Sequence, residues 1–215
     1  MAPPQQSNRK FADPLVREMA RRGQTRRFGK GELLIREGED GDAIFVILGG
    51  RVKVYVSDAQ GREMIVADYA AGDTVGEMVL DGKARSASVM ATEPTVCCVV
   101  ARDALRAAIH ADPDVAMRLI GTLIARNRFA TFNLKNLALM DVYGRVARLL
   151  LGLETVVEAD GLAWSRERLT QQEIASRVGA SRDMISRILK DLRTGGYIAM
   201  RDKRIAILRR PPARW

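Results

Sequence analysis

The chain has 215 residues, of which 47% are hydrophobic and 28% charged, a composition that is ordinary for a folded globular protein and excludes wholesale disorder. The net charge is +9, and residues 141–215 alone carry 15 Lys and Arg against nine Asp and Glu. This excess of positive charge favours a polyanionic partner contacted by the last third of the chain, although a solvated basic surface would give the same balance.

Residues 1–9 are rich in Pro and Gln and lack the apolar core of a secretory signal, so they predict a flexible tail. No apolar run approaches the roughly 20 residues that a membrane-spanning helix requires. A cytoplasmic protein without membrane contact is therefore expected. The two cysteines, Cys97 and Cys98, are neighbours in an apolar run, and successive side chains of a strand point to opposite faces. Buried structural thiols are favoured over a redox switch.

Residues 31–100 contain five short runs of β-forming residues separated by glycines, the pattern of a rolled antiparallel sheet. The runs are 43–48, 51–56, 64–69, 86–91 and 95–100. In the second run Val52, Val54 and Val56 alternate with Arg51, Lys53 and Tyr55. This alternation predicts that the valines form a buried face and the other three residues a wetter one.

The stretch from residue 76 to residue 88 combines an acid, a glycine-flanked turn and an arginine inside this β region. A short helical turn that starts at Gly76 would present free backbone N–H groups, and Arg85 with Ser86 could hold an anionic phosphate. Glu77 could accept a hydrogen bond from a sugar hydroxyl. A surface loop bridged by a Glu–Arg pair would fit the same residues.

Asp112 and Pro113 place an N-cap before a proline at the first helical position, and they predict a helix of seven or more turns over residues 112–140. A helix this long carries a stripe that the preceding sheet cannot fully cover. Pairing with its copy in a homodimer is therefore favoured over packing within its own chain. The predicted seam has apolar ends and a polar middle, namely Ala116, Leu119, Leu123, Arg126, Ala130, Asn133, Leu137 and Met140.

Beyond residue 140 the pattern changes to short helices, the first over residues 142–153. Thr170 and Glu173 have the spacing of a capping box, Gly179 ends that helix, and Ser181 can cap the next one. The next helix has an apolar stripe made of Ile185, Ile188, Leu189 and Leu192. Its opposite face carries Arg182, Asp183, Ser186, Arg187 and Lys190.

Two short helices joined by a glycine-containing turn can place the second helix in the major groove of DNA. Arginine can donate a fork of two hydrogen bonds to guanine, and a carboxylate can accept one from cytosine. The double glycine at residues 195–196 ends the second helix. Residues 197–200 and 204–208, joined across residues 201–203, then predict a basic β-hairpin, or wing. An amphipathic helix with a solvated charged face is the alternative.

In this order the motifs resemble those of the cyclic-AMP receptor protein and fumarate-nitrate regulator (Crp/Fnr) family of transcription regulators. The resemblance covers residues 25–210. It is carried by Gly31-Glu32-Leu33-Leu34-Ile35, Phe45-Val46-Ile47, Gly76-Glu77 with Arg85-Ser86-Ala87, Asp141-Val142 with Gly144-Arg145, and Gln172-Glu173-Ile174-Ala175 with Ser181-Arg182 and Arg187-Ile188-Leu189. It implies an α+β protein with four parts: a tail and short helix (1–24), a cyclic-nucleotide-binding, jelly-roll-like β-roll (25–111), a dimerisation helix (112–140) and a winged helix-turn-helix domain (141–215).

The resemblance also implies roles for individual residues. Glu77 would bond the ribose 2′-hydroxyl of a cyclic mononucleotide, and Arg85 with Ser86 would hold its cyclic phosphate. The implied ligand set is Gly76, Glu77, Met78, Arg85, Ser86, Ala87, Ala130 and Thr131. The implied DNA set is Gln172, Ser181, Arg182, Asp183, Ser186, Arg187 and Lys203.

Three departures from the family pattern qualify these roles. The resemblance favours cAMP as the allosteric ligand, but Ala130 stands where members commonly carry a hydroxyl residue that faces the base, so cGMP stays open. The loop from Glu77 to Arg85 is one or two residues shorter than usual, and Ala84 replaces a common proline. Asp183 replaces the usual Glu and shifts the expected operator preference.

The expected partners are double-stranded DNA, the cyclic mononucleotide, a second copy of the chain and RNA polymerase. The alternative is a Crp/Fnr-type regulator that binds DNA without a cyclic mononucleotide or responds to another effector, such as a cyclic dinucleotide. The sequence contains no nucleophile–base–acid set, no metal-spaced His and Cys group and no Walker loop, so neither catalysis nor a metal site is expected. The single histidine, His110, argues against haem.

Overall fold

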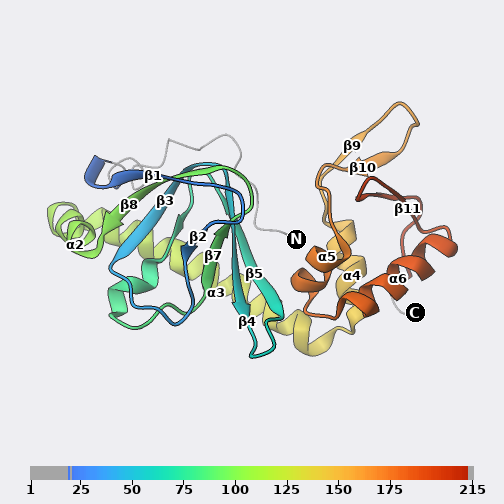
Figure 1. Cartoon of the computed structure of the whole chain (residues 1–215), viewed down its shortest axis with the longest axis horizontal. Helices are drawn as coiled ribbons and strands as arrows, with labels where there is room; N and C mark the ends of the chain where they lie inside the picture. Colours follow the sequence, from blue (N-terminus) through green and yellow to red (C-terminus); the bar gives the residue numbers. More distant parts are fainter. Residues whose placement is uncertain (1–18, 20, 213–215) are drawn as a thin grey trace. The chain divides into compact units, whose positions relative to one another are not determined.

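The computed structural model describes residue 19 and residues 21–212. The chain divides into two compact units, one within residues 5–129 and the other within residues 130–215 (Figure 1). The long helix α3 (Pro113–Leu139) contributes to both units. The predicted tail at residues 1–9 lies outside the described residues.

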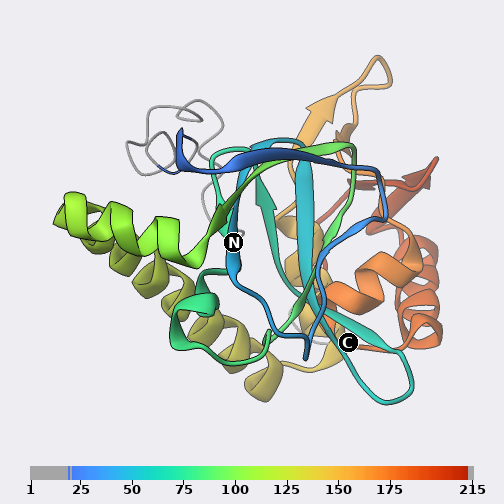
Figure 2. The same ribbon diagram turned by 60° about the vertical axis from the view of Figure 1, so that its left-hand side comes forward.

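Two four-stranded antiparallel sheets form most of the first unit, with strand orders β1-β8-β3-β6 and β2-β7-β4-β5. Figure 2 shows the strands of this unit in blue to green. Residues from both sheets, among them Phe28, Ile47, Val52, Val89 and Cys97, pack into one buried cluster. The predicted β-roll is therefore confirmed. Its strands are β1 (Gln24–Phe28), β2 (Leu33–Ile35), β3 (Ala43–Gly49), β4 (Arg51–Ser57), β5 (Glu63–Ala70), β6 (Thr74–Val75), β7 (Ser88–Ala91) and β8 (Thr95–Ala101).

The faces of β4 differ from the prediction. Tyr55, expected on the wetter face, is buried, while Val54 and Val56 are half-buried. The ammonium group of Lys53 lies 4.6 Å from the ring centre of Tyr55 and also pairs with Glu63. The pairing of β4 with β5 shifts in register between Val54 and Tyr55, and this irregularity breaks the alternation, so that Val52 and Tyr55 are the buried side chains of the strand.

The two thiols lie on opposite faces of β8, as predicted. Cys97 belongs to the cluster between the sheets, and Cys98 packs in a second cluster with Met19 and Ile44. Burial raises the pKa of the Cys97 thiol to about 12 and raises that of Cys98 as well. The thiolate, which is the reactive species, is therefore scarce at neutral pH in the folded protein.

We expect the folded protein to resist maleimide at pH 7–8 and to gain two adducts once urea unfolds it, because unfolding returns both thiols to an ordinary pKa of about 8.5. Mass spectrometry of timed samples measures this. Rapid modification of a protein with an unchanged circular dichroism spectrum would contradict the buried placement.

Helix α2 (Arg102–Ala111) follows β8, and α3 begins at Pro113 as predicted. The Asp112 carboxylate accepts a hydrogen bond from the backbone N–H of Asp114 at 3.0 Å. Leu119, a predicted seam member, is buried in its own unit. The exposed large apolar side chains of this part of α3 are Met117, Ile120, Leu123 and Ile124, and of these Leu123 belongs to the predicted seam. Leu119 is therefore covered within its own unit, which corrects that part of the prediction, whereas Leu123 is exposed and the pairing of α3 with its copy stays a prediction.

The second unit packs three helices against a sheet of order β11-β12-β10-β9. The helices bury Val146, Leu150, Ile174, Ile185 and Leu189 in one cluster. The β9–β10 hairpin extends away from the helices (Figure 1) and is absent from the prediction. The elements are α4 (Val142–Leu151), β9 (Thr155–Val157), β10 (Ala163–Ser165), α5 (Gln171–Val178), α6 (Arg182–Thr194), β11 (Ile198–Arg201) and β12 (Arg204–Ile207).

The predicted caps of the helix-turn-helix are present. The Thr170 hydroxyl accepts from the backbone N–H of Glu173 at 3.1 Å, and the Glu173 carboxylate accepts from that of Thr170 at 2.7 Å. Gly179 ends α5 with a φ of 66°, and the Ser181 hydroxyl caps α6. The wing turns at residues 202 and 203, whose positive φ values fit a two-residue type I′ turn.

Among the described residues, no helix combines the length and the apolar character that crossing a membrane would require.

Candidate functional site

The predicted phosphate-binding segment is built on a short 3-10 helix, η1 (Glu77–Asp81), with Gly76 before it and Gly82 after it. Both glycines have positive φ values, 85° and 72°, which side chains rarely adopt. The chain therefore turns sharply at each end of η1. This geometry brings Arg85 back toward the residue at which the turn began.

Arg85 is held by backbone oxygens. Its Nη1 donates to the carbonyl of Gly76 at 2.9 Å and its Nη2 to that of Ala43 at 2.6 Å. The residue is 9% exposed. Burial lowers the pKa of the guanidinium, whereas nearby Asp42 and Glu77 raise it. A guanidinium has five N–H donors, so the two carbonyl bonds engage two of them.

Gly41 packs directly against this guanidinium. A Cβ atom added at Gly41 would lie 2.4 Å from both Nε and Nη2 of Arg85. Such a distance is far below van der Waals contact, and two carbonyl bonds restrain the arginine from moving aside. The absence of a side chain at residue 41 therefore keeps Arg85 in place.

We expect Gly41→Ala to displace Arg85 and to weaken any anion binding that depends on it by about tenfold, the equivalent of one lost hydrogen bond to a charged group. Gly49→Ala is the matched control, because a Cβ at Gly49 meets no atom within 4 Å and its φ is not positive. Calorimetry with a cyclic nucleotide measures the difference. Equal affinities in the two variants would show that Arg85 does not need this space.

Glu77 already has a partner from the long helix. Its Oε1 lies 2.7 Å from Nη1 of Arg126, and the two side chains are only 13% and 19% exposed. Arg126 also donates to the carbonyl of Thr74 and lies 4.4 Å from the ring centre of Tyr69. Sequence reasoning placed Arg126 in the dimer seam and missed this contact. One signal in the sequence could have indicated it: Arg126 is a charged residue at a position of the heptad-like repeat that is otherwise occupied mainly by apolar side chains of a covered helix face.

The remaining predicted ligand residues are divided between the units. The Ser86 hydroxyl donates to Sδ of Met78 at 2.8 Å, and both residues are exposed. Ala87 is half-buried beside them. Ala130 and Thr131 are exposed on α3 in the second unit. The first unit thus gathers residues 76–78 and 85–87 around η1, and the part played by residues 130 and 131 stays a prediction.

The predicted DNA-contacting residues lie on exposed surfaces of the second unit. Arg182, Asp183 and Arg187 are exposed on α6, opposite its buried stripe, and Ser186 is half-buried between them. Residues four apart on a helix share a face, so these side chains form one surface at the N-terminal end of α6. The exposed residues Gln172, Ser181 and Lys203 lie at the start of α5, at the cap of α6 and in the wing turn.

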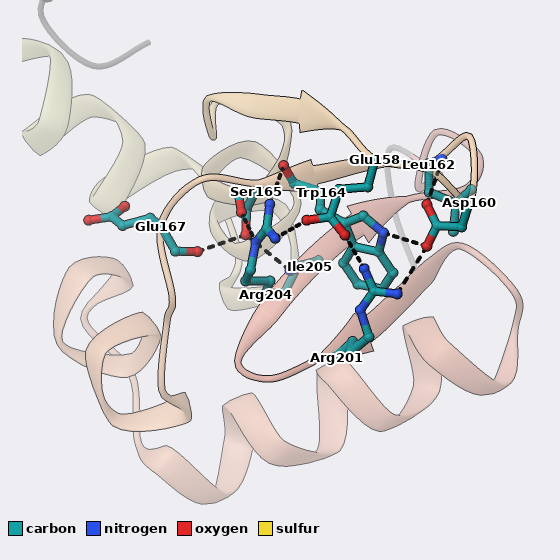
Figure 3. A network of polar contacts seen from close by, with 9 residues as sticks. All are labelled: Glu158, Asp160, Leu162, Trp164, Ser165, Glu167, Arg201, Arg204 and Ile205. Atoms are coloured by element: carbon teal, nitrogen blue, oxygen red, sulfur yellow. Dashed lines mark hydrogen bonds and ion pairs between the residues drawn. The ribbon is translucent and has the colours of Figure 1, made fainter.

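A network of polar contacts joins the wing to the β9–β10 hairpin (Figure 3). The guanidinium of Arg201 lies 4.3 Å from the ring centre of Trp164 and pairs with Asp160 and Glu158. The indole N–H of Trp164 donates to Asp160 at 2.9 Å. Arg204 pairs with Glu158 and donates to the Ser165 carbonyl. Two arginines of the predicted basic wing therefore neutralise carboxylates of the chain, which leaves the exposed Lys203 as the cation at the wing turn.

Comparison with known proteins gives two family matches along this chain. Residues 25–112 match the cyclic nucleotide-binding domain, and residues 144–211 match the Crp-like helix-turn-helix domain. The first match covers the β-roll with η1 and Arg85. The second begins within α4 and extends past β12.

The curated relatives cover most of the chain. The cAMP-activated global transcriptional regulator CRP of Salmonella typhimurium is 34% identical over 180 residues, which are 81% of this chain and 84% of that protein. A CRP-like cAMP-activated global transcriptional regulator of Mycobacterium tuberculosis is 33% identical over 183 residues, 84% of this chain and 82% of its own.

Solved structures share the fold. The c-di-GMP responsive global regulator CLP of Xanthomonas campestris has a TM-score of 0.80 at 22% identity and covers 91% of this chain and 98% of its own. A CRP-family transcriptional regulator of Thermus thermophilus has a TM-score of 0.71 at 25% identity, covering 86% of this chain and 92% of its own.

Proposed function

Because the chain belongs to the Crp/Fnr family of transcription regulators, we propose that it binds a two-fold symmetric operator as a homodimer and that a cyclic mononucleotide, cAMP rather than cGMP, gates this binding. Family membership itself makes it a DNA-binding regulator with a cyclic-nucleotide-binding domain, not an enzyme. The choice of cAMP is supported by relatives of 33–34% identity that are named as cAMP-activated.

The observation that carries the gating proposal is the contact between Glu77 and Arg126. Glu77 is the residue expected to accept from a ribose hydroxyl, and Arg126 projects from α3. A ligand at Glu77 changes the partners of an arginine on the long helix. Ligand binding in the β-roll would thereby change the contacts of α3, the helix that continues into the second unit.

Gating requires that the nucleotide bind two arrangements of the protein with unequal affinity. We propose that Arg85 and Ser86 hold the cyclic phosphate and that ligand binding biases a hinge near residues 140–141 between two placements of α6. The exposed residues Met117, Ile120 and Ile124 support pairing of α3 with its copy. RNA polymerase stays a predicted partner of the DNA-bound dimer.

A second candidate is a family member that binds DNA without a cyclic mononucleotide or answers to another effector. It is favoured by the internal partners of the two key residues, since Arg85 bonds two backbone carbonyls and Glu77 pairs with Arg126. In this candidate these contacts are permanent and the β-roll is a structural support.

Fluorescence anisotropy with an operator selected from random DNA separates the candidates. Affinity is measured alone and with cAMP, cGMP or c-di-GMP, alongside thermal shift of the protein with each nucleotide. The first proposal expects about 5–150-fold tighter operator binding with cAMP. If neither cAMP nor cGMP changed the operator affinity, the first proposal would be rejected in favour of the second candidate.

Lys203 at the wing turn is expected to contact phosphate. Lys203→Ala should weaken binding to specific and unrelated DNA alike and should lower the slope of log affinity against log salt by about one. The exposed β-roll residue Lys83 is the control, and Lys83→Ala should leave the slope unchanged. A loss confined to the selected operator would assign Lys203 to base reading instead.

A further inference from the structure

Arg145 in the first turns of α4 reaches the ends of two other helices. Its Nη1 donates at 2.7 Å to the carbonyl of Met140, directly after α3. Its Nε donates at 2.7 Å to the carbonyl of Val178, the last residue of α5, and its Nη2 at 3.3 Å to that of Gly179, the cap of the same helix. One side chain is therefore bonded to the ends of α3 and α5 together.

Guanidinium chemistry suits this position. The last carbonyls of a helix have no intrahelical donor and lie at the negative end of the helix dipole, where a cation is stabilising. A guanidinium offers five N–H donors in a fixed plane, whereas a lysine ammonium is a point charge that cannot span two helix ends in one geometry. The three bonds hold the α3 end and the α5 end at a set separation.

The residues that Arg145 holds lead directly to the DNA-reading helix. Gly179 starts the turn between α5 and α6, and its backbone is in the left-handed region. Two residues later Ser181 caps α6. Fixing the carbonyls of residues 178 and 179 therefore fixes the point from which α6 departs.

Separate contacts attach α4 to α3. Nη1 of Arg148 donates to Oδ1 of Asn136 at 3.1 Å, and its guanidinium lies 4.3 Å from the ring centre of Phe132. The Asp141 carboxylate caps α4 by accepting from the N–H of Gly144 at 2.7 Å. These contacts join α4 to α3 or cap α4, whereas the bonds of Arg145 also reach α5.

We propose that Arg145 is a positioning residue that transmits the arrangement at the end of α3 to the turn that orients α6. When the end of α3 moves, the guanidinium can keep its bonds to Met140 and to residues 178 and 179 only if α5 and the turn after it move as well. The proposal deepens the proposed function, on which it rests for the effector that moves α3.

The test compares Arg145→Gln and Arg145→Lys with the parent protein and with Arg209→Gln. Arg209 is the matched control because it donates to the carbonyl of Gly195, the cap of α6, and so binds a helix end without touching α3 or α5. Operator affinity is measured with and without cAMP, nucleotide affinity by calorimetry, and amide hydrogen exchange over residues 136–145 and 176–185.

Both Arg145 variants should bind cAMP as the parent does, yet the enhancement of operator binding by cAMP should fall from about 5–150-fold to below about twofold. Exchange at residues 179–181 should become faster while α4 stays protected. Arg209→Gln should keep the enhancement. A variant that retains the enhancement, or that loses operator affinity equally with and without cAMP together with a lower melting temperature, would overturn the proposal.

Hydrogen exchange distinguishes failure of the Arg145 proposal from failure of the proposed function. If operator binding by the parent ignores every nucleotide, the gating proposal is rejected, and the role of Arg145 is judged from exchange alone. Selectively faster exchange at residues 179–181 in Arg145→Gln then supports it, and parental exchange there contradicts it. Arg145→Lys keeps the charge and gives the same comparison if Arg145→Gln does not fold.

Discussion

Arg85→Met is expected to bind a cyclic mononucleotide at least about 100-fold more weakly than the parent, because two hydrogen bonds to a charged phosphate contribute about 1.5–3 kcal/mol each. The guanidinium is buried, and its two carbonyl bonds engage two of its five N–H donors. A methionine of similar length fills the space and donates nothing. Calorimetry with cAMP measures the loss.

The same change also removes the donors of the Gly76 and Ala43 carbonyls, so the fold of the variant has to be checked by its circular dichroism and melting temperature. Lys83→Gln is the control for charge, since Lys83 is an exposed cation of the same loop. We expect it to bind cAMP with nearly parental affinity. If a folded Arg85→Met protein bound cAMP with parental affinity, Arg85 would not be the residue that binds the cyclic phosphate.

Arg182→Ala should cost about 1–3 kcal/mol of operator binding, which is about 5–150-fold, and should relax the base preference at one position of each half-site. Arg182 is the first residue of α6 and is exposed beside Asp183. A forked donor at the N-terminal end of a recognition helix reaches base edges, so its removal penalises the matched sequence most. Selection from random DNA measures the preference.

Arg193→Ala is the matched comparison for this prediction, because Arg193 is an exposed arginine in the last turn of the same helix. We expect its removal to leave the preferred sequence unaltered. If Arg182→Ala selected the parental operator with undiminished preference, base reading would have to be reassigned to Asp183, Ser186 or Arg187.

Local signals predicted the helix-turn-helix correctly. The capping box at Thr170 and Glu173, the left-handed Gly179 and the Ser181 cap each act within one turn of chain, so sequence spacing determines them. The start of α3 at Pro113 follows from the same kind of short-range rule. The β-roll was predictable because glycines mark most of its turns.

Long-range contacts were not predictable. Which side chains of α3 are covered is determined by packing between segments that lie far apart in the sequence, such as Thr74 and Arg126, which are 52 residues apart. Likewise Arg201 finds Trp164 and Asp160 on a distant hairpin. The β9–β10 hairpin itself left a usable signal, since Asp160 and Gly161 form a turn-type dipeptide.

The anchoring of Arg85 by main-chain oxygens bears on how effector preference evolves. Carbonyl groups are present whatever side chain occupies residue 43, so drift there does not remove that acceptor, and the left-handed backbone of Gly76 keeps its own carbonyl aimed at the cation. Neighbouring positions with ordinary exposed side chains, such as Met78 and Ser86, are then free to vary around a constant positive charge. If Arg85 holds a phosphate as proposed, substitutions at these exposed positions would change which phosphate-containing ligand binds while the guanidinium keeps its place.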